Sequence, residues 1–332
     1  MDSIVVDVGG TSLRIGYFGA GGLVGVRRCL VESFKVNEGT SSAELYERLV
    51  AQLCGGLQDF LTAYPAAPIG LSFPGPIDGA GRVVSAPTLW GAALRDVDLA
   101  DDLRRRLGRS ILMLNDISAA VWRYAAPDSG DFCLITISSG IGNKVYRGGE
   151  ILLNSRGLGG EIGHCRVGYG DFALPCDCGG TGHLGALASG RGTLQLSYML
   201  ALRDPGAVAE SPLGRRWVKD TSPQWTTADL VSAIHSADPF AMNVLSTAQS
   251  FLISAMSHLY HWIGVQRFIF IGGFATAIGA PYIDNLNHLL ARESWFGIEP
   301  DAMGALCSAG APDDDHGLIG VGRYVANMGE AQ

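Results

Sequence analysis

The start of the sequence carries a short set of residues that could bind a nucleotide phosphate: Asp7, Gly9, Gly10, Thr11 and Arg14. Glycines let backbone N–H groups approach phosphate oxygens closely, while the Thr11 hydroxyl and the Arg14 guanidinium add further donors. Asp7 could hold Mg²⁺ through water. A tight hairpin with an incidental aspartate explains this short motif equally well.

Two further glycine turns follow predicted buried strands, at residues 132–137 and 268–271. A single short glycine motif occurs often by chance. Three such turns at strand ends are the parts expected of a nucleotide cleft between two lobes. The residues of these two turns are Ser138, Ser139, Gly140, Gly272 and Gly273.

Asn115 and Asp116 follow the predicted strand 111–114 and precede a predicted helix that starts near Ala119. A carboxylate at a strand end can accept the proton of a substrate hydroxyl, and a neighbouring amide can orient that substrate. The alternative is that one of the two residues caps the helix. Position alone favours the cap.

The glycine-rich segment 157–192 contains four residues that could ligate a metal: His164, Cys176, Cys178 and His183. Two thiolates and two imidazoles form a closed tetrahedral zinc set, which is typical of structural sites. Such a clasp stabilises a loop that has no core of its own. The alternative is an inert cysteine pair with two surface histidines, and the local spacing favours zinc.

The composition indicates a folded protein with two lobes. The chain has 332 residues, of which 47% are hydrophobic and 17% charged, and this length exceeds the usual size of one core. The net charge is -8, and no Lys/Arg run predicts a nucleic-acid surface. No apolar stretch is long enough to span a membrane. We therefore expect neither nucleic acid nor membrane as a partner.

The cysteines and the N-terminal residues bear on the cellular compartment. The cysteine count is seven, and most of them stand alone on apolar segments, which is typical of reduced thiols in the cytoplasm. The first residues lead directly into the apolar stretch 4–6 without a basic and apolar leader. We expect a cytoplasmic protein.

The elements that must position these residues follow an order that occurs twice. A strand, a glycine turn and a second strand are predicted near residues 4–18 and again near 132–146. Apolar residues at helical spacing predict long helices over 43–61 and 240–263. The repeat predicts two related α/β lobes that each offer a backbone loop.

Taken together, these motifs make the sequence resemble the ROK family (repressors, open reading frames, kinases) of sugar kinases over nearly the whole chain. The similar segments are 7–16, 70–78, 115–116, 159–190 with its Glu-x-Gly-His and Cys-x-Cys-Gly clusters, and 271–273. The resemblance implies an α/β, actin-like ATPase (ribonuclease H-like) fold with two lobes around a cleft for ATP and substrate.

The resemblance also implies a domain layout and an assembly. Residues 1–117 would form the small N-terminal lobe, and residues 118–315 the larger lobe with the zinc loop 157–192. A helix at about 316–332 would pack back on the first lobe. Family members are often dimers or tetramers, so a homo-oligomer is expected.

The roles implied for single residues centre on Asp116, which would be the general base rather than a helix cap. ATP with Mg²⁺ would bind at the three glycine turns. Zinc would fix the loop and orient Glu161 and His164 toward the substrate. The acceptor would contact Gly75, Thr88, Asn115, Asp116, Glu161 and His164.

The sequence departs from the family pattern at several site positions. His183 replaces the third cysteine and remains a competent zinc ligand, and residues 138–140 read Ser-Ser-Gly instead of Gly-Thr-Gly. Gly185 stands where the family's glucose kinases have a glutamate that contacts the sugar ring, and Thr88 stands where asparagine is frequent. Loss of such a carboxylate costs about 1.5 to 3 kcal/mol for the original substrate.

We therefore expect ATP-dependent phosphorylation of a hydroxyl, by analogy a primary one, on a sugar-like acceptor. An amino sugar such as kanosamine or a C7 cyclitol, as in antibiotic biosynthesis, is favoured over glucose. The alternatives are an ordinary glucokinase or N-acylhexosamine kinase, and a sugar-binding or regulatory member without catalysis. A DNA-binding repressor is disfavoured, because the first motif begins at Asp7 and leaves no room for a preceding winged helix.

Overall fold

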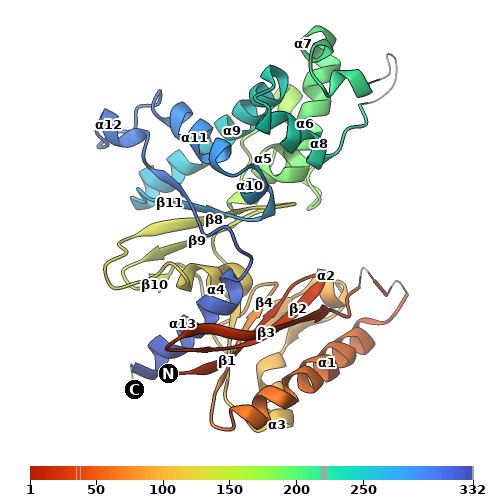
Figure 1. Cartoon of the computed structure of the whole chain (residues 1–332), viewed down its shortest axis with the longest axis vertical. Helices are drawn as coiled ribbons and strands as arrows, with labels where there is room; N and C mark the ends of the chain where they lie inside the picture. The colour runs from red at the N-terminus through yellow and green to blue at the C-terminus, as the bar shows by residue number, and fades with distance from the viewer. Residues whose placement is uncertain (35, 38, 218–222, 331–332) are drawn as a thin grey trace. The chain divides into compact units, whose positions relative to one another are not determined.

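The structure is a computed structural model that describes residues 1–34, 36–37, 39–217 and 223–330 (Figure 1). The chain divides into two compact units. The first contains residues 1–130, 146–159 and the segment from Asp313 onward, and the second contains residues 131–145 and 160–312. The described residues form two five-stranded sheets, of which the first lies within the first unit, whereas the second has β8, β11 and β12 in the second unit and β10 in the first.

The sheet of the first unit has the strand order β3-β2-β1-β4-β7. β4 and β7 run parallel to β1 and to each other, while β2 is antiparallel to β1 and to β3. The elements of this unit are β1 (Ser3–Val8), β2 (Ser12–Gly19), β3 (Gly22–Leu30), α1 (Ser42–Ala63), β4 (Ile69–Phe73), β5 (Val83–Ser85), α2 (Pro87–Trp90), β6 (Arg95–Val97), α3 (Leu99–Leu107), β7 (Ile111–Asn115), α4 (Asp116–Trp122), β10 (Glu150–Ile151) and α13 (His316–Glu330).

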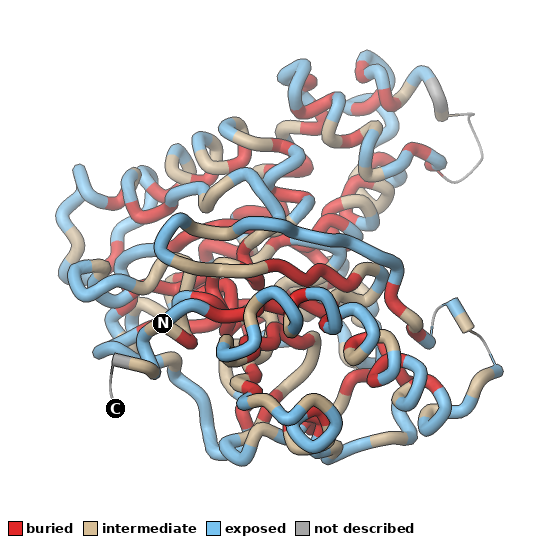
Figure 2. The backbone as a smooth tube through the Cα atoms, turned by 60° about the horizontal axis from the view of Figure 1, so that its bottom comes forward, coloured by how far each residue is buried: buried red, intermediate tan, exposed pale blue. Residues whose placement is uncertain are grey.

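Helices cover both faces of this sheet, so that β1 and β4 are buried at every position while the edge strand β3 is largely exposed (Figure 2). Side chains alternate between the two faces along a strand. Ile4 and Val6 pack in the cluster that includes α1, whereas Val5 packs with Ala119 of α4 and Val321 of α13. This alternation explains why the β1 sequence is apolar without interruption.

The helix α13 approaches its neighbours closely because it carries glycines on its contact face. A Cβ on Gly320 would lie 1.7 Å from the carbonyl oxygen of Ala119 in α4. A Cβ on Gly70 of β4 would likewise lie 3.0 Å from Val321. The close packing fixes α13 against the strands that carry the candidate site residues.

The second five-stranded sheet has the order β10-β9-β8-β11-β12. Its strands β8, β11 and β12 run parallel to one another. The elements are β8 (Phe132–Ile137), β9 (Ile141–Arg147), α5 (Leu184–Ala188), α6 (Gly190–Arg203), α7 (Pro205–Ala209), α8 (Thr227–His235), α9 (Pro239–Ile263), β11 (Phe268–Ile271), α10 (Gly273–Ile278), α11 (Ala280–Leu290), α12 (Pro300–Met303) and β12 (Cys307–Ala309), with short 3₁₀ turns at 162–164, 170–172 and 214–216.

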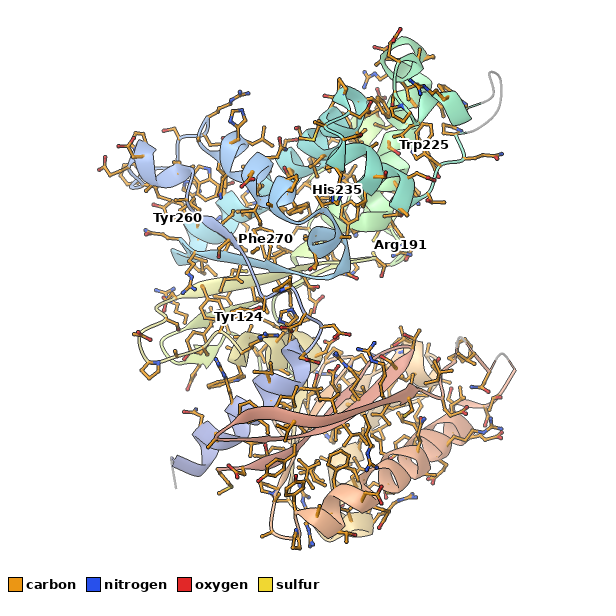
Figure 3. The ribbon with its side chains drawn as sticks, in the orientation of Figure 1. Tyr124, Arg191, Trp225, His235, Tyr260 and Phe270 are labelled. Atoms are coloured by element: carbon orange, nitrogen blue, oxygen red, sulfur yellow. The ribbon has the colours of Figure 1, made fainter. Side chains whose placement is uncertain are left out.

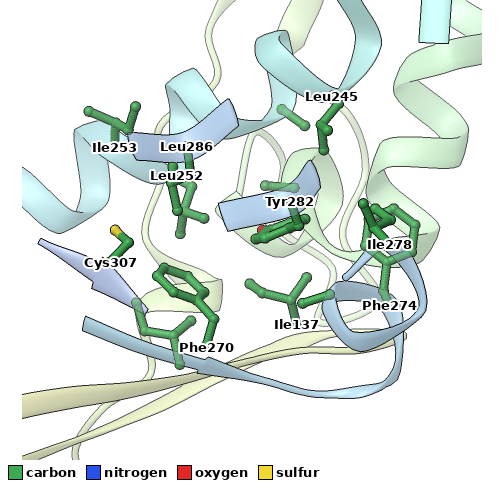
Figure 4. Packing of buried hydrophobic residues seen from close by; sticks show 14 of the residues in the cluster. Ile137, Leu245, Leu252, Ile253, Phe270, Phe274, Ile278, Tyr282, Leu286 and Cys307 are labelled. Carbon is green, nitrogen blue, oxygen red and sulfur yellow. The ribbon is translucent and has the colours of Figure 1, made fainter. Parts of the chain in front are cut away.

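The core of the second unit lies between this sheet and the long helices. Figure 4 shows Phe270 of β11 next to Tyr282 of α11, with Leu252 of α9 nearby, and these residues belong to one buried cluster. α9 presents most of its apolar stripe to this cluster, as the helical spacing of its sequence predicts. The two glycine turns of this unit follow β8 and β11, whose side chains are mostly buried.

The predicted α/β class is confirmed by the two mixed sheets with their helices. The unit division differs from the predicted lobe boundary after residue 117, because α4 packs against α13 within the first unit. The expected C-terminal helix over about 316–332 is α13, and residues 331–332 lie outside the described residues. Within the described ranges, none of the helices combines the length and the apolar character needed to cross a membrane.

Candidate active site and metal centre

The carboxyl ends of three parallel strands meet at one edge of the first sheet. Asp7 of β1 pairs with Ser72 of β4, and Phe73 of β4 pairs with Asn115 of β7. Asp116 follows as the first residue of α4. Ligands of open α/β sheets bind at this carboxyl edge, so the topology brings the predicted base and the predicted first phosphate motif to one edge.

Asn115 organises the surroundings of Asp116. Its Oδ1 accepts hydrogen bonds from the backbone N–H groups of Ile117 at 3.1 Å and Ser118 at 3.2 Å, which makes Asn115 the N-cap of α4. Its Nδ2 donates to the carbonyl oxygen of Gly75 at 3.0 Å and to Oδ1 of Asp116 at 2.8 Å. The cap is therefore Asn115, and its amide orients the half-buried carboxylate of Asp116.

The first glycine turn lies beside Thr88. The turn closes through a hydrogen bond from the Gly9 N–H to the Ser12 carbonyl at 2.8 Å, and Thr11 is exposed. A Cβ on Gly10 would lie 3.9 Å from the Cβ of Thr88, which is exposed on α2. A predicted phosphate turn and a predicted acceptor contact are thus neighbours within the first unit.

Arg14 contacts carboxylates. Its guanidinium is buried and lies 2.6 Å from Asp7, 3.1 Å from Asp314 and 3.4 Å from Asp315. Burial alone would lower the pKa of Arg14, but the charge and the hydrogen bond of Asp7, together with the two other carboxylates, raise it above its usual value. Arg14 is a structural ion-pair partner here, and its role as a phosphate ligand stays a prediction.

Asp7 is buried and has protein partners on both oxygens. Oδ2 accepts from Arg14, and Oδ1 accepts from the Ser72 hydroxyl at 2.5 Å. A Cβ on Gly317, at the start of α13, would lie 2.2 Å from Oδ1. These contacts fix the carboxylate, and its use toward Mg²⁺ also stays a prediction.

The acidic run Asp313, Asp314 and Asp315 lies ahead of α13 and was not predicted from the sequence. Asp313 pairs with Arg123, and Asp314 pairs with Arg28. The hydrogen bond from Arg123 is the main cause that lowers the pKa of Asp313 to about 2. Three consecutive acidic residues in front of a predicted helix were the available signal.

His316, the first residue of α13, is buried behind this run. Its Nδ1 lies 3.1 Å from the Tyr124 hydroxyl and 3.3 Å from the Arg123 guanidinium. Burial and the charge of Arg123 lower the pKa of His316 to about 4, against the opposing charge of Asp313. The imidazole is therefore neutral at neutral pH.

The two glycine turns of the second unit lie side by side, because β8 and β11 are parallel neighbours. A Cβ on Gly272 would lie 2.7 Å from the Ile137 carbonyl oxygen, and one on Gly273 would lie 4.0 Å from the Ser138 hydroxyl. A cavity of about 460 Å³ opens at these turns, which is large enough for part of a nucleotide. Its lining residues are Ser138, Ser139, Gly190, Arg191, Thr227, Ala228, Val231, Gly273, Phe274 and Ala277.

The structure brings together the four residues of the predicted zinc set. Donor atoms of His164, Cys176, Cys178 and His183 all lie within 4.8 Å of one another. Nδ1 of His164 is 3.9 Å from Sγ of Cys176, and Nδ1 of His183 is 3.2 Å from Sγ of Cys178. Tetrahedral zinc with its usual bond lengths separates such donors by roughly 3.3 to 3.8 Å. The cluster therefore fits a zinc ion.

Strand β9 supports the Glu161–His164 segment from behind through two buried polar residues that the sequence analysis missed. The side chain of Asn143 accepts a hydrogen bond from the Ile162 N–H at 3.1 Å. The buried ammonium of Lys144 lies 3.8 Å from the Glu161 carboxylate, whose side chain is 55% exposed. Their positions on a strand far from the loop in sequence gave no local signal.

The predicted site residues thus fall into two sets, one in each unit. The first unit carries Asp7, Gly9, Gly10, Thr11, Arg14, Gly75, Thr88, Asn115 and Asp116. The second unit carries Ser138, Ser139, Gly140, Glu161, His164, Cys176, Cys178, His183, Gly272 and Gly273. Within the second unit, Gly140 and His164 line a further cavity of about 220 Å³ together with Gly185 and Arg191.

The chain belongs to the ROK family, because the model of that family matches residues 3–298. The chain is 41% identical over 331 residues to a C(7)-cyclitol 7-kinase of Streptomyces hygroscopicus subsp. jinggangensis. The match covers 98% of this chain and 94% of that protein. It is 32% identical over 220 residues to a 2-epi-5-epi-valiolone 7-kinase of an Actinoplanes species, covering 62% of this chain and 60% of the relative.

The solved structures agree with the fold. A ROK family glucokinase from Streptomyces griseus, in complex with glucose and AMPPNP, matches with a TM-score of 0.71 at 21% identity, covering 98% of this chain and 99% of that one. The predicted actin-like ATPase fold is thereby confirmed.

Proposed function

We propose that the chain is an ATP-dependent kinase that phosphorylates a C7 cyclitol at the hydroxyl of position 7. The observation that carries this proposal is the 41% identity to a C(7)-cyclitol 7-kinase along 98% of the chain. The similarity to a 2-epi-5-epi-valiolone 7-kinase supports the same class of acceptor. A homo-oligomer and a cytoplasmic location stay predictions.

The surroundings of Gly185 support an acceptor other than glucose. Gly185 lines the 220 Å³ cavity next to His164, at the position where glucose kinases of the family would have a glutamate. A Cβ on Gly185 would lie 3.1 Å from the carbonyl oxygen of Gly163, so a larger side chain requires the Glu161–His164 segment to shift. The position therefore favours an acceptor that needs no carboxylate there.

Asp116 is the proposed general base. Its carboxylate takes the proton of the acceptor hydroxyl, the acceptor oxygen forms a bond to the γ-phosphorus of ATP, and the bond to the bridging β,γ-oxygen breaks to release ADP. Asn115 holds the carboxylate in place through the 2.8 Å hydrogen bond to its Oδ1. Glu161 and His164 accept or donate hydrogen bonds to the acceptor's hydroxyls, and Lys144 supports Glu161 from the interior.

Two metal ions are part of the proposal. Zinc would be held by His164, Cys176, Cys178 and His183, whose donor atoms lie close enough together, and it would supply rigidity to a loop rich in glycine. Mg²⁺ would enter with ATP and neutralise charge on the phosphates. The residues of the glycine turn in the first set and of the two glycine turns in the second set are the proposed nucleotide contacts.

The test is a kinetic comparison of four acceptors: a valienol-type C7 cyclitol, kanosamine, N-acetylmannosamine and glucose. We expect kcat/KM for the cyclitol to exceed that for glucose by at least about tenfold, as expected when a ring contact is missing. ³¹P NMR of the product should place the phosphate on the exocyclic hydroxyl. Glucose as the best acceptor would overturn the proposed acceptor, and the absence of ADP release with every acceptor would overturn the kinase function.

The variant Gly185→Glu sharpens this test. It should raise the ratio of glucose to cyclitol kcat/KM by about tenfold, because it restores a carboxylate contact to the sugar ring. Gly185→Ala is the matched control, since it adds the crowding at Gly163 without the carboxylate. An equal effect of both variants would show that the position acts by steric crowding alone.

A further inference from the structure

The glycine turn at residues 138–140 of the second unit contains no cationic residue. Ser138, Ser139 and Gly140 carry no charge, although the triphosphate proposed to bind at this turn carries several negative charges. Among the described residues that line the 460 Å³ cavity, Arg191 is the only one with a charged side chain. A phosphate in this cavity would therefore meet one guanidinium.

Arg191 is anchored to the turn from the start of α6. The Gly190 N–H donates to the Ser138 carbonyl oxygen at 2.8 Å, and Nε of Arg191 donates to the Ser139 carbonyl oxygen at 3.0 Å. The same side chain lines both the 460 Å³ and the 220 Å³ cavities, and Figure 3 shows Arg191 on the α6 side of the second unit. Its position at the turn is thus fixed by the backbone.

The rest of the guanidinium is held only weakly. Its NH1 pairs with Asp177, and the two side chains are 59% and 73% exposed. Ion pairs with this exposure contribute little to stability, whereas hydrogen bonds between a guanidinium and a phosphate are charge-assisted and can be bidentate. A phosphate can therefore displace Asp177 from Arg191 at small cost.

We propose that Arg191 binds the phosphates of the nucleoside triphosphate, and that Asp177 forms an ion pair with the Arg191 guanidinium when no nucleotide is bound. The inference rests on the proposed kinase function and deepens it by assigning the cation of the Ser138–Gly140 turn. Asp177 acts as an internal competitor of the phosphate. Its removal should strengthen nucleotide binding, while the removal of Arg191 should weaken it.

The competing explanation is that Arg191 only ties the turn to the loop of Asp177. A structural tether would affect all ligands of the cavity, whereas a phosphate ligand affects only those that carry phosphate. Adenosine and AMP-PNP separate the two cases. The pair Arg203–Asp171 offers a matched control, because it lies at the other end of α6 with the same side-chain exposures of 59% and 73% and lines neither cavity.

The experiment measures binding of AMP-PNP with Mg²⁺, and of adenosine, to the full chain by calorimetry or competition. Arg191→Gln should weaken AMP-PNP binding by about ten- to a hundredfold and leave adenosine binding within about twofold. Arg191→Lys should fall between, because it keeps a point charge without the fork. Asp177→Asn should tighten AMP-PNP binding by about two- to fivefold, and Arg203→Gln should match the wild type.

The outcomes are distinguishable. Unchanged AMP-PNP binding in Arg191→Gln, or an equal loss for AMP-PNP and adenosine, would overturn the role of Arg191. Either result would leave the proposed kinase function standing. Weaker or unchanged AMP-PNP binding in Asp177→Asn, a variant that keeps Arg191, would overturn the competition between Asp177 and phosphate. A wild type that binds no AMP-PNP would overturn the kinase function together with this inference.

Discussion

The hairpins β1–β2 and β8–β9 share the order strand, glycine turn, strand, but they carry charge differently. In the first hairpin the charge is local and buried: Asp7 precedes the turn, Arg14 follows it, and the two form an ion pair. In the second hairpin the turn residues are uncharged, and the cation at the turn is the exposed Arg191, which comes from a helix about fifty residues later.

The same order of strand, glycine turn and strand can therefore serve two purposes. Buried and fully paired charges stabilise a fold, because breaking such a pair leaves an uncompensated charge in the interior. Exposed charges with a weak partner remain available to a ligand. We therefore expect loss of the buried pair Asp7–Arg14 in the first hairpin to change stability, and loss of the exposed Arg191 at the second to change ligand binding.

The largest effect is expected at Asp116, where the first unit carries the proposed chemistry. Asp116→Asn should lower kcat by about a hundred- to ten-thousandfold, which is the usual contribution of a general base. Binding of AMP-PNP should stay unchanged, because Asp116 is not among the proposed nucleotide contacts. Acceptor-dependent ADP release measures the effect, with the exposed Asp59→Asn as control. Retained turnover in Asp116→Asn would remove the base from the mechanism.

The next effect concerns the buried pair of the first hairpin. Arg14→Met should reduce the free energy of unfolding by about 3 to 5 kcal/mol, because it leaves the buried Asp7 without its cation. Arg27→Met on the neighbouring strand removes an exposed pair with Asp59 and should cost about 1 kcal/mol or less. Urea unfolding followed by circular dichroism compares the two. Equal losses would contradict the contrast between buried and exposed charge.

A smaller effect on stability, dependent on pH, is expected at the buried His316 beside Arg123. The pKa of His316 is about 4 in the folded protein, while an unfolded histidine has a pKa of about 6.5. The unfolded state therefore binds more protons between these values, and stability falls as the pH falls from about 6.5 to about 4. The loss should reach about 3 kcal/mol at most.

The variant His316→Gln should lack this slope, so that its stability relative to the wild type improves as the pH falls through this window. Thermal unfolding between pH 7 and pH 4 measures the difference. The exposed His288 provides the control through His288→Gln. Parallel pH curves for wild type and His316→Gln would show that the buried imidazole does not govern acid stability.

The smallest effect is expected for catalysis after loss of the metal. Wild-type protein should contain about one zinc per chain, and Cys176→Ser should lose most of it. The KM of the acceptor should then rise by about tenfold, because Glu161 and His164 lose their support, while AMP-PNP binding changes little. Elemental analysis and kinetics provide the readout. Cys165→Ser, next to His164 but outside the ligand cluster, should retain both zinc and activity.

The zinc cluster could be predicted from sequence because its ligands come from one short segment, His164 to His183, whose spacing already indicates a site. Asn115 shows the limit of local inference. A helix cap was expected at Asn115 or Asp116, and the structure places the cap on Asn115 while Asp116 begins the helix. The two interpretations of this pair were therefore compatible.

Other residues could not be predicted, because their partners are remote in sequence. Arg14 meets Asp315 across 301 residues, so the local motif could not predict the carboxylates that surround its guanidinium. Lys144 approaches Glu161 only because β9 lies behind the loop. Arg191 gains its place at the turn through α6. In each case the missing information was tertiary packing rather than residue type.

The glycine contacts of α13 have a consequence for protein synthesis. A ribosome makes β1 among the first residues and α13 only after all residues of the second unit. Until then, Val5 lacks its partners on α13, and the buried carboxylate of Asp7 lacks the cover of Gly317. The second unit can therefore fold before the first unit is complete. The packing of β1 against α13 can form only at the end of synthesis.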